Sequence, residues 1–129
     1  MRIGSTLNHA MRVSQSGLTA ERFRMDVISS NIANANSVKI GNQDPYRRRD
    51  VVLRGGPEGV QIEKVVEDQT AFRQVDDPNN PGQKTQGSNV DPLIEMVNML
   101  GASRAYEANI AAYNSAKGMV RAALQIGKI

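Results

Sequence analysis

The chain lacks several residue types from which proteins usually build sites and cores. None of its 129 residues is cysteine or tryptophan, and aromatic residues make up 4% of the chain. Without cysteine there is no disulfide, no thiolate metal ligand and no cysteine nucleophile. Because aromatics are few and much of the apolar fraction is alanine, one chain can bury only a modest apolar area. We therefore expect a lone chain to be poorly stabilised, with burial completed by neighbouring chains.

Long apolar runs and catalytic motifs are also missing. No stretch approaches the roughly 18 apolar residues that span a bilayer, and the segment Met1–Thr6 lacks the apolar core of a secretory signal. These signals alone indicate a cytoplasmic protein. His9 is the only histidine, and the chain has no Gly-x-Ser-x-Gly elbow, phosphate loop or residue pair at metal-ligand spacing. We expect no enzyme activity, no cofactor and no metal.

The net charge of +3 is spread along the chain. Counting basic minus acidic residues gives 5 − 2 = +3 for residues 1–40, 7 − 8 = −1 for 41–90 and 4 − 3 = +1 for 91–129. A nucleic-acid-binding surface would normally be denser in positive charge. We therefore expect no nucleic-acid partner.

Both ends of the chain show a heptad pattern, in which apolar residues recur at alternating spacings of three and four. The first row is Leu7, Met11, Ser14, Leu18, Glu21, Met25, Ile28, Ile32 and Ala35. The second row is Met96, Met99, Ser103, Tyr106, Ile110, Tyr113, Lys117, Val120 and Leu124. Such spacing is typical of a coiled-coil seam. It predicts that the two ends pair with each other or with neighbouring chains. A second stripe of small residues, Ala102, Ala105, Ala108, Ala112 and Ala116, indicates helix contacts on more than one side.

The middle of the chain has a different pattern. We predict helices over about 5–35 and about 91–126, the second with Asp91 as N-cap and Pro92 at its first position. Residues 47–53 and 60–66 are predicted to form two strands joined by a glycine-rich turn, and 76–87 an extended polar loop. The predicted fold is mainly α: two long helices pairing as a coiled-coil hairpin, with a small β insert. Its parts are an N-terminal arm (1–40), the insert (41–90) and a C-terminal arm (91–129).

Two separated motifs in this order resemble the flagellar basal-body rod family. Ser16-Gly17-Leu18 precedes a run from Ser30 to Ser37, and the second end carries two runs, 95–99 and 102–109. The matching residues are Ser16, Gly17, Leu18, Asn31, Ile32, Ala33, Asn34, Arg104, Ala105, Tyr106, Glu107 and Asn109, with Tyr46-Arg47-Arg48-Arg49 in the middle. Ser37 stands where the family usually has Thr, and Gly101 where relatives carry a helix former.

The resemblance implies a structural subunit that polymerises into the rod, the drive shaft for motility. It also implies export without cleavage through the flagellar type III apparatus, and a place in the rod as it crosses the periplasm. The implied partners are further copies of the chain, other rod proteins, and components of the membrane ring and export gate.

Three interpretations stay open at this point. The asparagines Asn31 and Asn34 are either turn or capping residues, or part of the family's assembly motif. The Arg47–Arg49 run is either a solvated strand edge or a salt-bridging contact, with a neighbouring subunit or with the acidic loop at residues 76–77. A soluble helical adaptor or export chaperone that binds partner helices is the alternative function.

Overall fold

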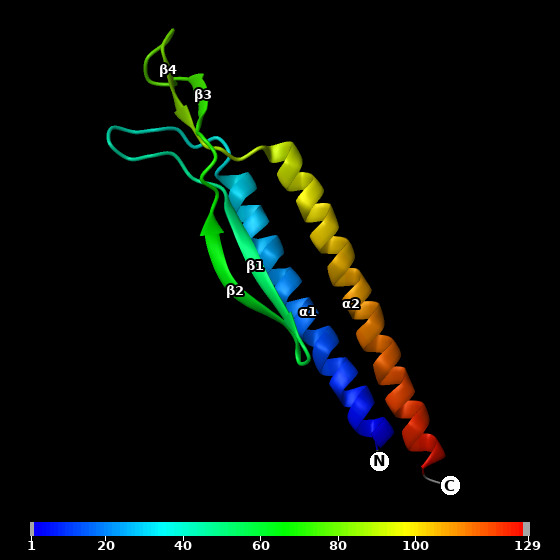
Figure 1. Ribbon diagram of the computed structural model, residues 1–129. Coiled ribbons are helices and arrows are strands. Elements are labelled where there is room, and N and C mark those ends of the chain that lie inside the picture. The colour runs from blue at the N-terminus through cyan, green and yellow to red at the C-terminus, as the bar shows by residue number, and fades with distance from the viewer. Residues whose placement is uncertain (1, 128–129) are drawn as a thin grey trace.

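Two long helices form the body of the molecule. In the computed structural model, which describes residues 2–127, α1 (Arg2–Ala33) and α2 (Pro92–Ile126) run antiparallel, and the chain ends lie together (Figure 1). At ~1.5 Å per residue, the 35 residues of α2 extend about 52 Å. Both predicted helices are therefore present, and α1 begins three residues earlier than expected.

The helix ends follow from local chemistry. Past Ala33 the chain turns, and the side chain of Asn34 donates to the carbonyl oxygen of Ser30 at 2.8 Å. At the start of α2 the carboxylate of Asp91 accepts from the amide of Leu93 at 3.0 Å, and Pro92 occupies the first turn. These caps satisfy backbone groups that a helix end leaves without partners. The predicted N-cap is confirmed.

The insert contains two hairpins, where the sequence predicted one. The expected pair, β1 (Arg49–Gly56) and β2 (Gly59–Glu67), is antiparallel. The prediction of an extended loop over 76–87 was wrong at its ends, because β3 (Arg73–Asp76) and β4 (Lys84–Gly87) pair there and leave a loop over 77–83. Their polar residues show no apolar alternation, so the pairing depends on backbone hydrogen bonds that residues 37–39 extend. The amide of Lys39 donates to the carbonyl oxygen of Gln86 at 2.9 Å.

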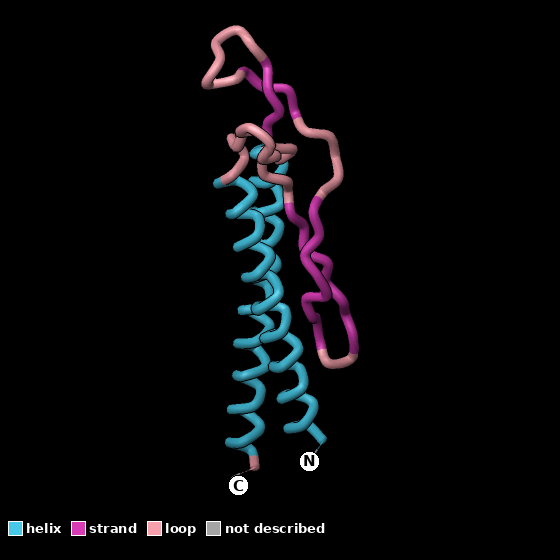
Figure 2. The backbone as a smooth tube through the Cα atoms, turned by 90° about the vertical axis from the view of Figure 1, so that its left-hand side faces the viewer, coloured by secondary structure: helices cyan, strands magenta, loops and turns pink. Residues whose placement is uncertain are grey.

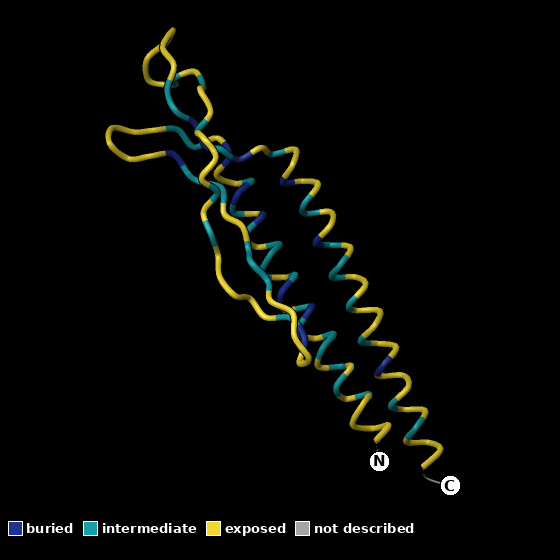
Figure 3. Tube along the Cα trace, in the orientation of Figure 1, coloured by how far each residue is buried: buried dark blue, intermediate teal, exposed yellow. Residues whose placement is uncertain are grey.

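α1 lies between the other two layers. The β1–β2 hairpin packs along one side of α1 and α2 along another, while β3–β4 projects beyond the end of the helices (Figure 2). Buried apolar residues are few and mostly small: Ala20, Ile28, Ala35, Val90, Ala102 and Ala116. Figure 3 shows most of both helices as partly or fully exposed. Among the described residues, neither helix has a window long and apolar enough to cross a membrane.

Candidate functional site

Small and polar residues make the closest contacts between the helices. A Cβ atom added to Gly17 would lie 2.7 Å from Nδ2 of Asn109, so α2 approaches α1 closely at this point. Fourteen residues along α1, Nδ2 of Asn31 donates to Oε2 of Glu95 at 3.1 Å. Because fourteen residues are two heptads, the same side of α1 faces α2 at both points.

On α2, the row that faces α1 is offset by one residue from the row that the sequence predicted. Five of the nine residues of the predicted row are half-buried: Met99, Ser103, Tyr106, Tyr113 and Val120. The other four are more open: Met96 is 55% exposed, Ile110 38% and Leu124 62%, and Lys117 is also exposed. Their neighbours Glu95, Ala102 and Ala116 are buried instead. α2 therefore turns small and polar residues toward α1, including part of the alanine stripe. Whether the predicted row is an assembly seam stays a prediction.

On α1, two triplets fourteen residues apart show the same arrangement. In Ser16-Gly17-Leu18, Oγ of Ser16 accepts from the amide of Val60 in β2 at 3.0 Å, while Gly17 faces α2. Leu18 is half-buried. Successive helix residues are about 100° apart. We call the residues of each helix that face the other helix, such as Gly17 on α1, the contact line. The residue before a contact-line residue of α1 therefore faces the insert, and the residue after it faces neither the insert nor α2.

The second triplet, Ser30-Asn31-Ile32, repeats this order near the end of α1. The hydroxyls of Ser30 and Tyr46 are 3.4 Å apart, Asn31 contacts Glu95, and Ile32 is half-buried. Each triplet of the first family motif thus contains one residue that contacts the insert, one that contacts α2 and one that faces neither.

The large apolar rows of the two helices lie on the same side of the pair. Each row follows its contact line by one residue, and in an antiparallel pair such positions flank the same edge. We call this surface the open face; it comprises Met11, Leu18, Met25 and Ile32 of α1 with Met96, Ser103, Ile110, Lys117 and Leu124 of α2. Leu7, further toward the N-terminus in the same predicted row, is half-buried.

Asn31 joins α1 to the insert and to α2. Its Nδ2 donates to the carbonyl oxygen of Arg49 at 2.8 Å as well as to Glu95, and its Oδ1 accepts from the amide of Arg49 at 3.0 Å and from the hydroxyl of Tyr46 at 2.8 Å. The side chain is fully buried with both donors and both acceptor sites used. It is therefore a junction residue, and the capping interpretation is wrong for Asn31 and right for Asn34.

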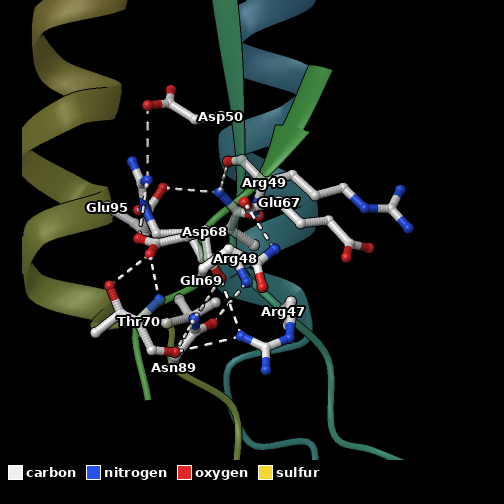
Figure 4. Close-up of polar contacts among 12 residues, drawn as sticks. Arg47, Arg48, Arg49, Asp50, Glu67, Asp68, Gln69, Thr70, Asn89 and Glu95 are labelled. Carbon is white, nitrogen blue, oxygen red and sulfur yellow. Dashed lines mark hydrogen bonds and ion pairs between the residues drawn. The ribbon is translucent and has the colours of Figure 1, made fainter. Parts of the chain in front are cut away.

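Glu95 is a fully buried carboxylate at the same junction (Figure 4). One oxygen accepts from Asn31, and the other pairs with Nε of Arg48. Arg48 also lies 3.6 Å from the carboxylate of Asp68 and 3.7 Å from that of Asp50. Burial opposes the charge of Arg48, but the hydrogen bond and charge of Glu95 outweigh it and raise the pKa of Arg48. Hydrogen bonds from Thr70, followed by the charge of Arg48, lower the pKa of Asp68.

The three arginines of the Arg47–Arg49 run have different surroundings. Arg47 donates to the carbonyl oxygens of Asp68 and Thr70 and lies 4.1 Å over the ring of Phe72. Arg48 pairs within the junction, whereas the side chain of Arg49 extends over Tyr46 and the residue is exposed.

The proposed contact of this run with the acidic loop at 76–77 was wrong. Asp76 pairs with Lys84 across β3 and β4, and Asp77 accepts from Asn79 and Asn80 in its own turn. Arg49 is the member of the run that stays exposed enough to contact a neighbouring subunit.

The second family motif divides between two sides of α2. Ala105, Tyr106 and Asn109 are half-buried, and Nη2 of Arg22 on α1 donates to the hydroxyl of Tyr106 at 3.3 Å. Arg104 and Glu107 are exposed, and neither forms an ion pair with another described residue. Ala33 and Asn34 of the first motif are exposed at the end of α1.

Two family models match the chain, one at each end. The model described as Flagella basal body rod protein matches residues 11–39, and Flagellar basal body rod FlgEFG protein C-terminal matches 83–126. The flagellar basal-body rod protein FlgC of Bacillus subtilis is 40% identical over 149 aligned positions, covering 95% of this chain and 99% of that protein. FlgC of Borreliella burgdorferi is 34% identical, covering 91% and 95%. FlgC of Escherichia coli O157:H7 is 36% identical, covering 90% and 94%.

The chain belongs to the FlgC family of flagellar basal-body rod proteins. It is a structural protein of the flagellar basal body, and not an enzyme. The two matched segments contain the contacts between the two helices, since 11–39 includes Gly17 and Asn31, and 83–126 includes Glu95 and Asn109. The hairpin β1–β2 lies outside both.

Gly101 is a candidate for stabilisation. It is exposed in the middle of α2, and an added Cβ would meet no atom of the chain within 4 Å. We expect Gly101→Ala to raise helicity and to increase the free energy of unfolding by up to about 1 kcal/mol, because glycine is a poor helix former. Circular dichroism during urea denaturation measures both quantities. If the variant gains helicity as expected but its cells swim poorly, a neighbouring subunit packs against this position.

Proposed function

We propose that this protein is a subunit of the proximal rod and polymerises through the open face into the torque-transmitting drive shaft. The observation that carries the proposal is the position of the large apolar rows. Although α1 and α2 already lie side by side, Met96, Ile110 and Leu124 of α2 stay exposed, and the α1 row beside them is covered only in part. Exposed apolar surfaces of this extent usually mark contacts with another protein.

The predicted coiled-coil packing then belongs chiefly between subunits. A neighbouring helix laid along the open face would cover residues from both helices and complete a core that one chain leaves unfinished. Torque applied to one subunit would load its neighbours through these long axial contacts. The neighbours are further copies of the chain and other rod proteins, with the membrane ring and export gate at the base.

Membership of the family supports a proposal for the route by which the chain reaches this position. We propose that the chain is exported through the type III apparatus without cleavage and is placed where the rod crosses the periplasm. A partly covered helix pair suits such a route, because little buried area has to be lost when the chain unfolds for export.

Ile110→Asp tests the open face on α2. Ile110 is 38% exposed, so a carboxylate there should leave the fold of the single subunit intact. In the assembled rod the same carboxylate would be buried without a partner. We expect cells carrying Ile110→Asp to be non-motile and to lack complete rods.

Ala111→Asp is the matched control, since Ala111 is the next residue and is also exposed. It lies about 100° further from the open face and should allow swimming. Swimming on soft agar and electron microscopy of basal bodies provide the measurements. Equal motility of both variants would refute assembly through this face.

A further inference from the structure

Two rows of α2 compete for the side that faces α1. The row seen in contact is Glu95, Met99, Ala102, Tyr106, Asn109, Tyr113, Ala116, Val120 and Ala123. The alternative row replaces five of these by the residue that follows each: Met96, Ser103, Ile110, Lys117 and Leu124. Because the rows share four residues, turning α2 about its axis by roughly half of a ~100° step exchanges them.

Apolar burial alone favours the alternative row. Burying Met96, Ile110 and Leu124 would remove more apolar area from water than burying alanines and an asparagine. Nevertheless Glu95, Ala102 and Ala116 are buried, at 0%, 0% and 6% exposure, while the large residues stay open. A directional polar interaction must therefore outweigh the free energy that burial of the larger apolar side chains would contribute.

We propose that Glu95 is the positioning residue that selects the face of α2 turned toward α1. Its carboxylate is held between Arg48 and Asn31, which belong to two different segments of the chain. This inference deepens the proposed function, because the same selection keeps the large apolar row on the open face for neighbouring subunits.

The geometry of the junction explains why the selection is strong. A buried carboxylate is stabilised only while its partners stay in hydrogen-bonding position. Turning α2 would bring Met96 toward Arg48 and Asn31, leaving one donor of Asn31 without its acceptor. Asp50 and Asp68 cannot replace Glu95, because both lie in the insert and would remain where they are.

The close approach lower on the helices favours the same face. Because Gly17 has no side chain, Asn109 packs directly against the backbone of α1. Even a Cβ atom on Gly17 would clash with Asn109, so the gap between the helices is too small for the larger side chain of Ile110. Glu95 therefore acts at the end of α2 nearest the insert, and Gly17 limits what fits further along.

Cysteine labelling of the purified full-length subunit tests the proposal, since the natural chain has no cysteine to interfere. Ala102→Cys places a thiol at a position that is 0% exposed, and Ser103→Cys at its half-buried neighbour. Adjacent positions share any fraying of the helix, so the ratio of their maleimide-labelling rates reports which face is inward. In the otherwise unchanged chain we expect position 103 to react faster than position 102.

Adding Glu95→Ala to each labelling variant should lower the 103-to-102 rate ratio about tenfold, the size expected when one charge-assisted hydrogen bond no longer favours the native face. Alanine is a good helix former and matches the rest of the inward row, so the helix should persist. Glu107→Ala, the same change on the exposed side of α2, should leave the ratio unchanged.

Each other outcome contradicts the proposal. An unchanged ratio in Glu95→Ala, or equal labelling of both positions before Glu95 is changed, would show that Glu95 does not hold the face. If Glu95→Ala loses its helical circular dichroism, Glu95→Met, which fills the vacated space, decides. If both Glu95→Ala and Glu95→Met unfold, Glu95 is required for folding and does not select the face of α2 that turns toward α1. The labelling needs no rod, so failure of the Ile110→Asp experiment would overturn the proposed function and leave this result standing.

Discussion

Asn31→Asp should destabilise the subunit by about 3 to 5 kcal/mol, the cost typical of a buried charge without compensation. The substitution hardly changes the size of the side chain, but it turns the two donor positions of Asn31 into acceptors. These would face the carboxylate of Glu95 and the carbonyl oxygen of Arg49, at positions now 3.1 and 2.8 Å from Nδ2. Urea denaturation followed by circular dichroism measures the loss.

Asn34→Asp is the matched control for this prediction. Asn34 belongs to the same motif three residues on, but it is exposed and makes one side-chain hydrogen bond, to the carbonyl oxygen of Ser30. Its replacement should cost no more than about 1 kcal/mol. Equal losses in the two variants would contradict the assignment of Asn31 as the junction residue, because the buried contacts would then carry no more energy than a helix cap.

The helices and the first hairpin could be predicted because their signals are local. The Asp91-Pro92 start depends on capping chemistry within one turn, and the glycine-rich segment ahead of Val60 depends on turn geometry. The pairing of β3 with β4 could not be predicted in this way. Its strands are four residues each and polar, and their partner, residues 37–39, is distant in sequence.

Periodicity predicted the inward face of α2 only in part, since the predicted and the observed rows share four of their nine residues. A heptad search ranks rows by apolar size, and that criterion selected Met96, Ile110 and Leu124. The structure instead buries a row with a carboxylate, because Arg48 and Asn31 meet Glu95 at the end of the helix pair. Two features of the sequence fit this row: it contains Ala102 and Ala116 of the alanine stripe, and a spacing of fourteen residues separates Gly17 from Asn31 and Glu95 from Asn109.

The predicted seam and the observed contact are compatible once both sides of the helix pair are considered. The residues of the contact line hold one chain together, and the residues that follow them remain available to other chains. The predicted row of α2 is therefore not the row that faces α1 within the subunit, and it is still available as the assembly surface between subunits.

Leu18→Asp should abolish rod assembly while leaving export largely intact. Leu18 lies in the Met11, Leu18, Met25 and Ile32 row of the open face and directly follows Gly17, so it faces neither the hairpin nor α2 squarely. Because Leu18 is already half-buried in the subunit, covering the rest of it between subunits should contribute roughly half of the ~1.5 to 3 kcal/mol that full burial of a leucine gives. A carboxylate forfeits that contribution, adds a desolvation cost, and repeats both losses in every copy of the polymer.

Thr19→Asp controls for the introduced charge, because Thr19 is the next residue and is exposed. Cells with Leu18→Asp should be non-motile and lack complete rods, with the subunit still detectable outside the inner membrane, whereas cells with Thr19→Asp should swim. Export handles an unfolded chain and should not distinguish the two variants. Fractionation, with microscopy of basal bodies, separates a block in export from a block in assembly. If Leu18→Asp cells swam as well as Thr19→Asp cells, the α1 half of the open face would not be an assembly surface, and subunit contacts would have to lie elsewhere on the helices or on the insert.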